Sequence, residues 1–334
     1  MTAYYLGIDI GGSKSHALVA DGRGRACGLG LAGPGNYEVV GWDGLRQILH
    51  AISNQALGSA GIGWEQVAGA GFGIGGYDWP AEEAPTHEAI NSLGLEAPYA
   101  VVNDSILGLL AGTAEGWGIV IVAGTSNNCR GRDRQGREGR VTGCGSVYGE
   151  YGGAVELVAR AVQAVARAWT QRGHRTRLTG AFIEAAGATN EVDLLEGLYL
   201  GRYNLGPAAA PLVFRVADEG DPVARETIQW AGRELASLAI GVIRQIEIEA
   251  LDFDVVLAGS LYDGGGLLIE AMQEAIHSVA PGACLVRLSA PPVVGGVLLA
   301  MEQAGIEPAA MRATLMASTD LMLRAHDRER PIEE

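Results

Sequence analysis

The chain has 334 residues, more than the roughly 250–300 at which a single hydrophobic core stops growing, and this length predicts two domains. Hydrophobic residues make up 48% and charged residues 19%, which excludes a disordered chain and leaves the tail 327–334 as the one segment expected to fray. The net charge of −15 argues against nucleic acid or an anionic membrane as a partner, but a nucleotide needs only a local cluster of amides and cations.

Cysteine and histidine usage gives no sign of a disulfide framework or a structural metal site. The four cysteines contain no CxxC pair and the six histidines form no HxxxH or HExxH pair. The N-terminus does not resemble a signal peptide, and no apolar run approaches the roughly 18–20 residues that span a bilayer. We therefore expect a cytoplasmic protein.

The first third of the chain predicts the element order βββαβαβα. Three short strands are separated by turn sequences rich in glycine, and buried strands then alternate with amphipathic helices. The expected strands are 3–12, 15–21, 26–33, 67–76 and 99–104, and the expected helices are 42–57, 82–94 and 105–113.

The same pattern then begins again, interrupted by a long helical region. The expected strands are 117–125, 128–133, 139–145, 253–260 and 283–289, with helices at 265–280 and 309–326. An internal duplication of this size predicts an α/β protein in which two mixed sheets face one another across a cleft, with glycine-rich strand ends pointing into it.

The first of these strand ends reads GIDIGGSKS, with Asp9 directly before a turn. Backbone amides of such a turn can converge on an anion, to which Lys14 adds a positive charge. Asp9 is suited to holding a hydrated Mg²⁺, which takes one or two carboxylates and leaves its other positions to water and phosphate. A tight glycine turn with an exposed lysine is the alternative interpretation, and the stretch alone does not separate the two.

Three further strand ends carry similar signals. Asp104 follows a buried strand and begins a helix, where it either caps the first turn or accepts a proton from a substrate hydroxyl. Gly124, Thr125 and Ser126 form a second small-residue turn, which is either a bare hairpin or the counterpart of the first phosphate turn. The sequence VVLAGSLYDGGG (255–266) allows a planar ring to lie close to the backbone, or is a plain strand–turn–helix.

In this order and spacing, the four features resemble the actin, hexokinase and heat-shock chaperone ATPase superfamily. Within it, the chain is most similar, over about residues 4–305, to the N-acetylglucosamine kinase and BadF/BadG/BcrA/BcrD ATPase family. The resemblance implies two ribonuclease H-like domains, at 1–115 and 116–305, with a helical insertion at about 155–250 and a C-terminal helix and tail at 306–334. It also implies a homodimer, ATP and Mg²⁺ as cofactors, and a small sugar as substrate.

The resemblance also assigns roles to residues that match the family's motifs. Asp104 is the implied catalytic base and Asp9 the implied Mg²⁺ residue, acting through water. The implied ATP-binding residues are Gly11, Gly12, Ser13, Lys14, Gly124, Thr125, Ser126, Gly259 and Ser260. The implied sugar-binding residues are Asn36, Gly75, Gly76, Asn103, Asp104, Gly145 and Glu150.

Two departures from the family's motifs concern the sugar rather than ATP. The chain reads GTSNNC where the sugar kinases usually read GTGSNC, and YGEYGG where they read GxxGDEGS, so that Glu150 replaces a shorter acid. The predicted activity is an ATP-dependent sugar kinase that phosphorylates a hydroxyl of an amino sugar, N-acetylglucosamine or glucosamine. The alternatives are an ATPase of the dehydratase-activator type, which would need an iron–sulfur cluster between subunits, and a non-catalytic sugar-binding relative.

Overall fold

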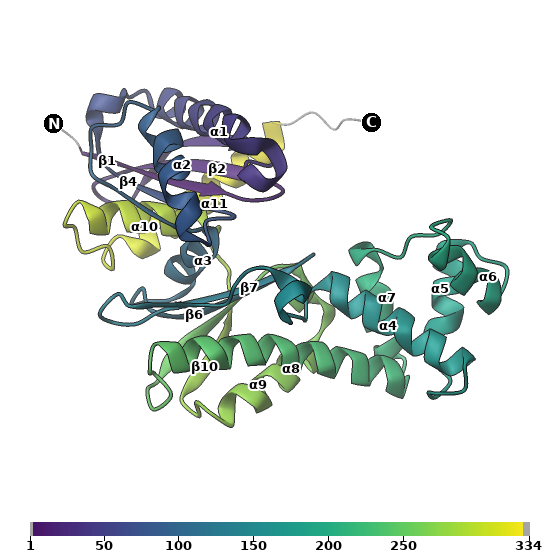
Figure 1. Ribbon diagram of the computed structural model, residues 1–334. Helices are drawn as coiled ribbons and strands as arrows, with labels where there is room; N and C mark the ends of the chain where they lie inside the picture. The colour runs from purple at the N-terminus through teal and green to yellow at the C-terminus, as the bar shows by residue number, and fades with distance from the viewer. Residues whose placement is uncertain (1–2, 330–334) are drawn as a thin grey trace. The chain divides into compact units, whose positions relative to one another are not determined.

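The computed structural model describes residues 3–329, which form two units, each built around a five-stranded sheet (Figure 1). The first unit contains the described residues up to Gly118 and those from Val286 onward, and the second contains Ile119–Leu285. The strand orders are β3-β2-β1-β4-β5 and β8-β7-β6-β9-β10, so the two sheets are arranged alike. The predicted duplication is therefore confirmed at the level of strand order.

In the first sheet, three parallel strands end at the same edge. β1 pairs antiparallel with β2 but parallel with β4, and β4 pairs parallel with β5. The carboxyl ends of β1, β4 and β5 therefore meet, and these are the ends after which the predicted polar residues follow. The strands are β1 (Tyr4–Ile10), β2 (Ser15–Asp21), β3 (Ala26–Ala32), β4 (Val67–Ile74) and β5 (Tyr99–Asn103).

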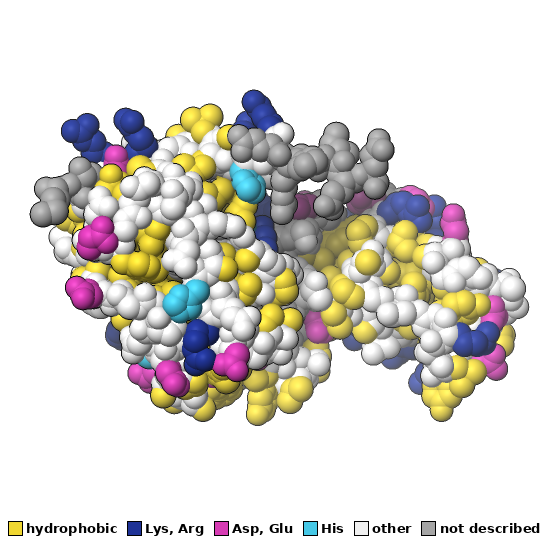
Figure 2. Space-filling model, turned by 90° about the horizontal axis from the view of Figure 1, so that it is seen from above, with side chains coloured by type: hydrophobic (Ala, Val, Ile, Leu, Met, Phe, Trp, Pro, Cys, Tyr) yellow, Lys and Arg dark blue, Asp and Glu magenta, His cyan; other side chains and the backbone are white. Residues whose placement is uncertain are grey.

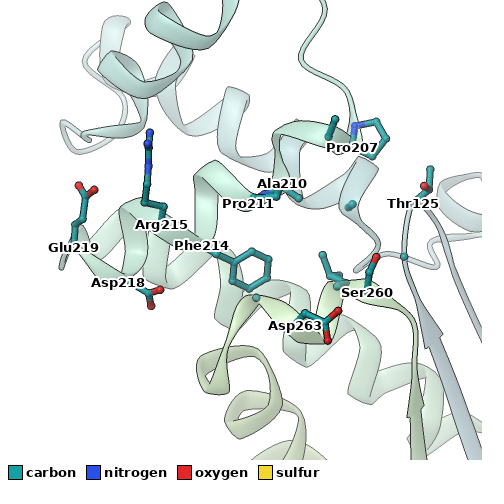
Figure 3. A pocket seen from close by; sticks show the side chains of 15 residues that line it. Thr125, Pro207, Ala210, Pro211, Phe214, Arg215, Asp218, Glu219, Ser260 and Asp263 are labelled. Carbon is teal, nitrogen blue, oxygen red and sulfur yellow. The ribbon is translucent and has the colours of Figure 1, made fainter. Parts of the chain in front are cut away.

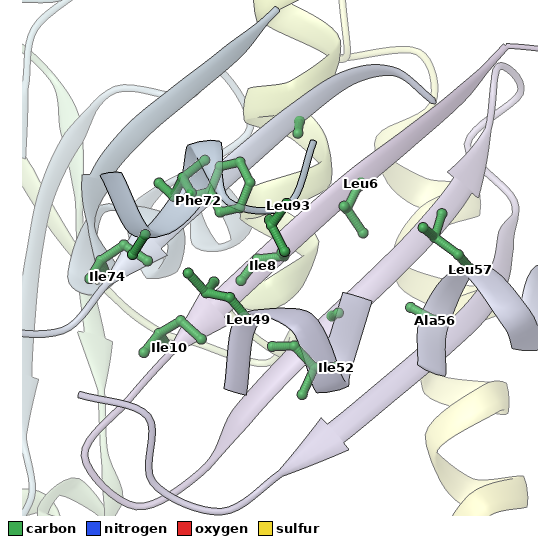
Figure 4. Close-up of a cluster of buried hydrophobic side chains, with 14 of the residues drawn as sticks. Leu6, Ile8, Ile10, Leu49, Ile52, Ala56, Leu57, Phe72, Ile74 and Leu93 are labelled. Carbon is green, nitrogen blue, oxygen red and sulfur yellow. The ribbon is translucent and has the colours of Figure 1, made fainter. Parts of the chain in front are cut away.

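Side chains that alternate along β1 cover both faces of this sheet. Leu6, Ile8 and Ile10 pack against Leu49 and other residues of α1 (Tyr37–Ala60), as Figure 4 shows. Tyr5 points to the opposite face, where it joins a second hydrophobic cluster with α10 (Val293–Gln303). α2 (Pro80–Asn91) lies on the α1 face, and α3 (Asp104–Gly112) and α11 (Arg312–Glu329) complete the unit.

The helix α10 and its place in the fold differ from the sequence prediction, which gave no helix at 290–305 and assigned this stretch to the second domain. In the structure α10 packs on β1, β4 and α3 of the first unit. Glycines permit this approach, since a Cβ on Gly7 would lie 2.4 Å from the Val297 nitrogen. The chain thus returns to the first unit at Val286 rather than after residue 305.

The second unit contains the other sheet and most of the helices. Its strands are β6 (Gly118–Ala123), β7 (Asn127–Arg132), β8 (Glu138–Arg140), β9 (Phe253–Ala258) and β10 (Ala283–Arg287). The strand expected at 139–145 is wrong beyond Arg140, because Gly143 and Gly145 adopt positive φ angles and a 3₁₀ turn follows at Gly145–Tyr148. This leaves a loop where a longer strand was predicted.

Five helices occupy the stretch between β8 and β9, and α9 (Gly266–His277) follows β9. The five are α4 (Ala154–Trp169), α5 (Leu178–Ala186), α6 (Glu191–Tyr199), α7 (Ala210–Asp218) and α8 (Pro222–Gln245). In the part of the chain that the structure describes, no helix is both long and apolar enough to cross a membrane. Residues 330–334 of the tail expected to fray lie outside the described residues.

Charged side chains are interspersed on the face of the molecule shown in Figure 2. The face shown in Figure 2 carries Lys and Arg side chains in several separate places, among Asp, Glu and hydrophobic side chains. On this face they do not gather into one basic stripe of the kind that follows a nucleic-acid backbone.

Candidate functional site

The turn between β1 and β2 is closed by its own backbone. The Gly11 amide donates to the Lys14 carbonyl at 3.0 Å, and the side chains of Ser13 and Lys14 are exposed. The Gly11 carbonyl accepts hydrogen bonds from the amides of Gly35 and Asn36, at 3.1 and 3.3 Å. The AGPGN segment (32–36) is therefore fastened to the turn, which explains how Asn36 reaches this edge of the sheet.

Asp9 has the environment of a cation ligand. Its carboxylate lies at the end of β1 with 8% of the residue exposed, and it faces His16 across the β1–β2 pair, with 3.8 Å between His16 Nδ1 and Asp9 Oδ2. No lysine or arginine of residues 3–329 forms an ion pair with it. A buried carboxylate without a cationic partner is costly unless a cation binds there.

The donor set at Asp9 suits Mg²⁺ better than a metal that takes all its ligands from protein. Within residues 3–329, no group of three or more His, Cys, Asp or Glu side chains is placed to hold a metal ion. Mg²⁺ commonly binds one or two carboxylates and takes its remaining ligands from water and phosphate. The residues present therefore fit a hydrated Mg²⁺ that accompanies a phosphate ligand.

At the end of β4, the backbone brings three predicted residues together. A Cβ on Gly75 would lie 3.3 Å from Asp104 Oδ2 and 3.6 Å from Asn36 Nδ2, so both side chains approach this glycine. The Gly75 amide donates to the Ile10 carbonyl at 2.7 Å, which ties the end of β4 to that of β1. A side chain on Gly75 would fill the space beside the Asp104 carboxylate.

The start of α3 bears on the capping interpretation of Asp104. Asn103 is the N-cap residue, and its Oδ1 accepts from the Ser105 amide at 3.1 Å and from the Ser105 hydroxyl at 2.5 Å. Asp104 is the first residue of the helix and is only half-buried. The N-cap residue is thus Asn103, whose side chain is buried.

A network beside this edge was not predicted from the sequence. Asn103 Nδ2 donates to Asp78 Oδ1 at 3.4 Å, and Glu82 accepts from the amides of Asp78 and Trp79, both at 2.6 Å. The Tyr37 hydroxyl also donates to Glu82, at 2.9 Å, and burial together with this carboxylate raises the pKa of Tyr37 far above its usual range. The network holds the loop after Gly76 in place. In the sequence, only the acid of GIGGYD (73–78) indicated that such a network forms.

In the second unit, the turn after β6 repeats the first turn in a shorter form. The Gly124 amide donates to the Ser126 carbonyl at 2.9 Å, and Thr125 and Ser126 are exposed. The carbonyls of Gly124 and Thr125 accept the amides of Ala154 and Val155, the first residues of α4, at 2.9 and 3.1 Å. The turn is thereby anchored to a helix while its hydroxyl groups remain accessible.

Gly259 joins this turn to the end of β9. Its φ of 105° and ψ of 160° are open to glycine and hardly to other residues, and a Cβ there would lie 2.2 Å from the Ala123 carbonyl oxygen. Gly259 therefore allows β6 and β9 to end in contact. Ser260 follows on the surface, on the same side as Gly124 and Thr125, since all three line one cavity.

That cavity has a volume of about 910 Å³ and lies within the second unit (Figure 3). Figure 3 shows the Phe214 ring facing the segment that carries Ser260 and Asp263, with Thr125 at one end and the charged residues of α7 at the other. The remaining lining residues are mostly small or apolar. They are Ala154, Pro207, Ala208, Ala210, Pro211, Leu261 and Gly264, and the charged ones are Arg215, Asp218, Glu219 and Asp263.

The contribution of α7 to this cavity was missed by sequence reasoning. The helix lies within the predicted insertion, about 40 residues before β9 in the chain, and carries no motif. Gly264 is the first glycine of the GGG stretch (264–266). A Cβ there would lie 2.6 Å from Phe214, so the absence of a side chain makes room for that ring. The run of glycines was a signal for close packing, but not for what packs there.

Glu150 organises the loop that replaces the predicted strand end. It is buried, and its two carboxylate oxygens accept the amides of Thr142 and Gly145, at 2.6 and 3.3 Å. Its own amide donates to the Gly145 carbonyl at 3.0 Å. Glu150 and Gly145 are thus brought together, and the longer acid is used to hold the loop.

The two cysteines that bear on the activator alternative have different environments. Cys129 lies in β7 and is fully buried, and burial raises the pKa of its thiol far above the usual range. Cys144 is exposed, and both are free thiols.

The predicted site residues fall into two groups, one around Asp9 and Asp104 in the first unit and one around Gly124 and Gly259 in the second.

Comparison with known proteins identifies relatives over nearly the whole chain. The BadF/BadG/BcrA/BcrD ATPase family matches residues 6–300. The N-acetylmuramic acid/N-acetylglucosamine kinase of Clostridium acetobutylicum is 24% identical over 304 residues, 90% of this chain and 99% of that protein. The N-acetyl-D-glucosamine kinase of Dictyostelium discoideum is 25% identical over 311 residues, 89% and 97% of the two chains.

Solved structures share the fold. A protein of Chromobacterium violaceum, proposed to be an N-acetylglucosamine kinase, superposes with a TM-score of 0.60 at 21% identity, covering 89% of this chain and 98% of its own. The α/β architecture with two mixed sheets is thus the fold of sugar kinases.

Proposed function

Since the chain belongs to the BadF/BadG/BcrA/BcrD ATPase family, we propose that it is an ATP-dependent kinase of an amino sugar, N-acetylglucosamine or glucosamine. The observation that carries this proposal is the position of Asp104, whose carboxylate approaches Gly75 and Asn36 at the end of β4. The names of both curated relatives include N-acetylglucosamine, which supports this acceptor class over the activator and sensor alternatives.

The nucleotide base and ribose bind in the cavity of the second unit. Its volume of about 910 Å³ lies within the range of roughly 300–1,000 Å³ of small-molecule sites. The purine lies against the Phe214 ring, and the carboxylates of Asp218 and Asp263 accept hydrogen bonds from amino or hydroxyl groups of the nucleoside. Thr125 and Ser260 mark the end toward which the phosphates extend.

Each of the two small-residue turns is suited to binding phosphate. Exposed hydroxyls of Ser13 and Thr125 donate to phosphate oxygens, and Lys14 offsets the charge of the transferred group. Asp9 holds the hydrated Mg²⁺, which when bound neutralises charge on the phosphates. Gly11, Gly12, Gly124 and Ser126 shape these turns so that backbone can approach the ligand.

Asp104 acts as the general base toward the acceptor hydroxyl. A carboxylate at the start of a helix and beside Gly75 can accept the proton that the hydroxyl loses as it attacks phosphorus. Asn36 and the backbone at Gly75 and Gly76 orient the sugar ring beside it. Asn103 positions Asp104 by capping α3 rather than by contacting the sugar.

Glu150 and Gly145 are the proposed sugar-binding residues of the second unit. Each carboxylate oxygen has two acceptor positions, so Glu150 can accept a sugar hydroxyl in addition to the loop amides that it already binds. Substitution by the shorter acid of the related kinases changes the loop as well as the sugar contact. This is where the acceptor preference of the chain differs from that of its relatives.

The proposal is tested by measuring ADP release with N-acetylglucosamine, glucosamine, N-acetylmuramic acid, glucose and no sugar. We expect sugar-dependent turnover that falls by about 10²–10⁴ in Asp104→Asn, while calorimetry shows that nucleotide and sugar still bind. Asp43→Asn, an exposed residue of α1, is the matched control and should retain activity. Turnover that needs no sugar and is unaffected by Asp104→Asn would contradict the kinase assignment.

Two finer features accompany the proposal. The family resemblance supports a homodimer, for which light scattering should give twice the mass of one chain. Use of ATP as phosphate donor supports action in the cytoplasm, which fractionation of the producing cells would test.

A further inference from the structure

A second cavity, of about 400 Å³, lies among the helices of the second unit and has a different chemistry from the nucleotide cavity. It is formed by the end of α4, the segment after it and the first two turns of α8, and it shares no lining residue with the cavity around Phe214. We call it the arginine cavity. The polar residues that line it include Arg160, Gln163, Arg167, Arg172, His174 and Glu226.

Local structure explains why three arginines meet here. Arg160 and Arg167 are seven residues apart on α4, which places them on one helical face. The chain then bends back, because the amides of Arg172 and Gly173 both donate to the Arg167 carbonyl, at 2.8 and 3.0 Å. This bend returns Arg172 and His174 to the end of the helix they have just left.

The positive charge of the arginine cavity is only partly balanced by the side chains that line it. Arg160 stacks on Trp230, with 4.8 Å from its guanidinium carbon to the ring centre, and Arg172 Nε donates to the Thr170 hydroxyl at 3.0 Å. Among the residues that the structure describes, no carboxylate forms an ion pair with Arg160, Arg167 or Arg172. Three arginines face one glutamate, Glu226, in a chain whose net charge is −15.

From this geometry we infer that the arginine cavity binds a phosphorylated monosaccharide, at a site separate from the proposed kinase site. Guanidinium groups bind phosphate through paired, charge-assisted hydrogen bonds, and three of them match a dianionic phosphate monoester. Gln163 and Glu226 supply donor and acceptor groups for sugar hydroxyls, and the volume suits a ligand of this size. The inference does not depend on the kinase assignment, because it uses none of the same residues.

The test is calorimetric titration of the full chain with N-acetylglucosamine 6-phosphate or inorganic phosphate. Saturating AMPPNP and N-acetylglucosamine are present throughout, so that the proposed kinase site is filled. We expect the sugar phosphate to bind, more weakly as salt is raised, and Arg167→Gln and Arg172→Gln each to weaken it about tenfold or more. Arg233→Gln, an exposed arginine of α8 outside the cavity, is the matched control and should change the affinity less than twofold.

Three results would overturn the inference. One is the absence of binding while the kinase site is filled, and another is equal affinity in the wild type and Arg167→Gln. The third is inorganic phosphate binding as tightly as the sugar phosphate, which would remove the role of Gln163 and Glu226. Unchanged circular dichroism of the variants excludes misfolding as the cause of lost binding, and is expected because Arg167 and Arg172 are exposed.

Discussion

The Gly259→Ala substitution would add one methyl group where β9 ends, and the structure gives the size of its effect. At φ 105° and ψ 160°, an L-residue costs about 1–3 kcal/mol relative to glycine. The new Cβ would lie 2.2 Å from the Ala123 carbonyl oxygen and force the ends of β6 and β9 apart. Overpacking of this kind typically costs about 1–3 kcal/mol. We therefore expect the free energy of unfolding of the second unit to fall by about 2–6 kcal/mol.

Gly265→Ala is a control that separates the two contributions. Gly265 has a similar backbone conformation, φ 122° and ψ 174°, but no heavy atom lies within 4 Å of the position its Cβ would take. It should lose only the backbone contribution, about 1–3 kcal/mol. The difference between the two variants therefore measures the contact between Gly259 and Ala123.

The assay is urea unfolding followed by circular dichroism and tryptophan fluorescence, with nucleotide affinity measured by calorimetry on the folded proteins. Gly259→Ala should be the less stable variant and should bind ATP more weakly, because Gly124 and Ser260 on either side of the contact line the cavity proposed to bind the nucleotide. Equal stability and equal ATP affinity in the two variants would refute the reasoning.

Three further predictions concern other parts of the chain. The backbone amide of Thr189, with further hydrogen bonds, lowers the pKa of Asp193 to about 2, so its contribution to stability is complete above about pH 4 and is lost as the pH falls toward 2. Urea unfolding should show this acid loss in the wild type and not in Asp193→Asn, and an identical loss in both would contradict it. Phe214→Ala should raise KM for ATP about tenfold or more with kcat little changed, and an unchanged KM would place the purine elsewhere. A thiol reagent should modify Cys144 in the native protein and Cys129 only after unfolding, and rapid modification of Cys129 would contradict its burial.

The parts of the site that were predictable from the sequence depend on short-range patterns. Asp9 lies near the end of the apolar strand β1, Asp104 directly follows the apolar strand β5, and the turn after β1 is marked by two glycines. Such local signals predict that a residue lies at a strand end without any information about how the rest of the chain folds. The edge that gathers Asp9, Gly75 and Asp104 then follows from parallel pairing of β1, β4 and β5.

The parts that were not predictable depend on packing between distant segments. Phe214 reaches Gly264 from a helix with no motif, and the role of Glu150 depends on amides eight and five residues before it in a loop that was expected to be a strand. The apolar stretch that forms α10 could, from its sequence, have been a helix or a strand. Its place in the first unit depends on close contacts at glycines, and only folding brings those contacts together.

The return of the chain to the first unit at Val286 has a consequence for the order in which the protein folds. The second unit is one continuous segment, so it can fold as soon as it has left the ribosome. The sheet of the first unit is synthesised earlier, but the face that carries Tyr5 and Leu18 stays uncovered until α10 emerges. During synthesis this face of the N-terminal sheet therefore remains exposed until α10 has been made, about 200 residues later. We expect the nascent chain to depend most on chaperones during this interval.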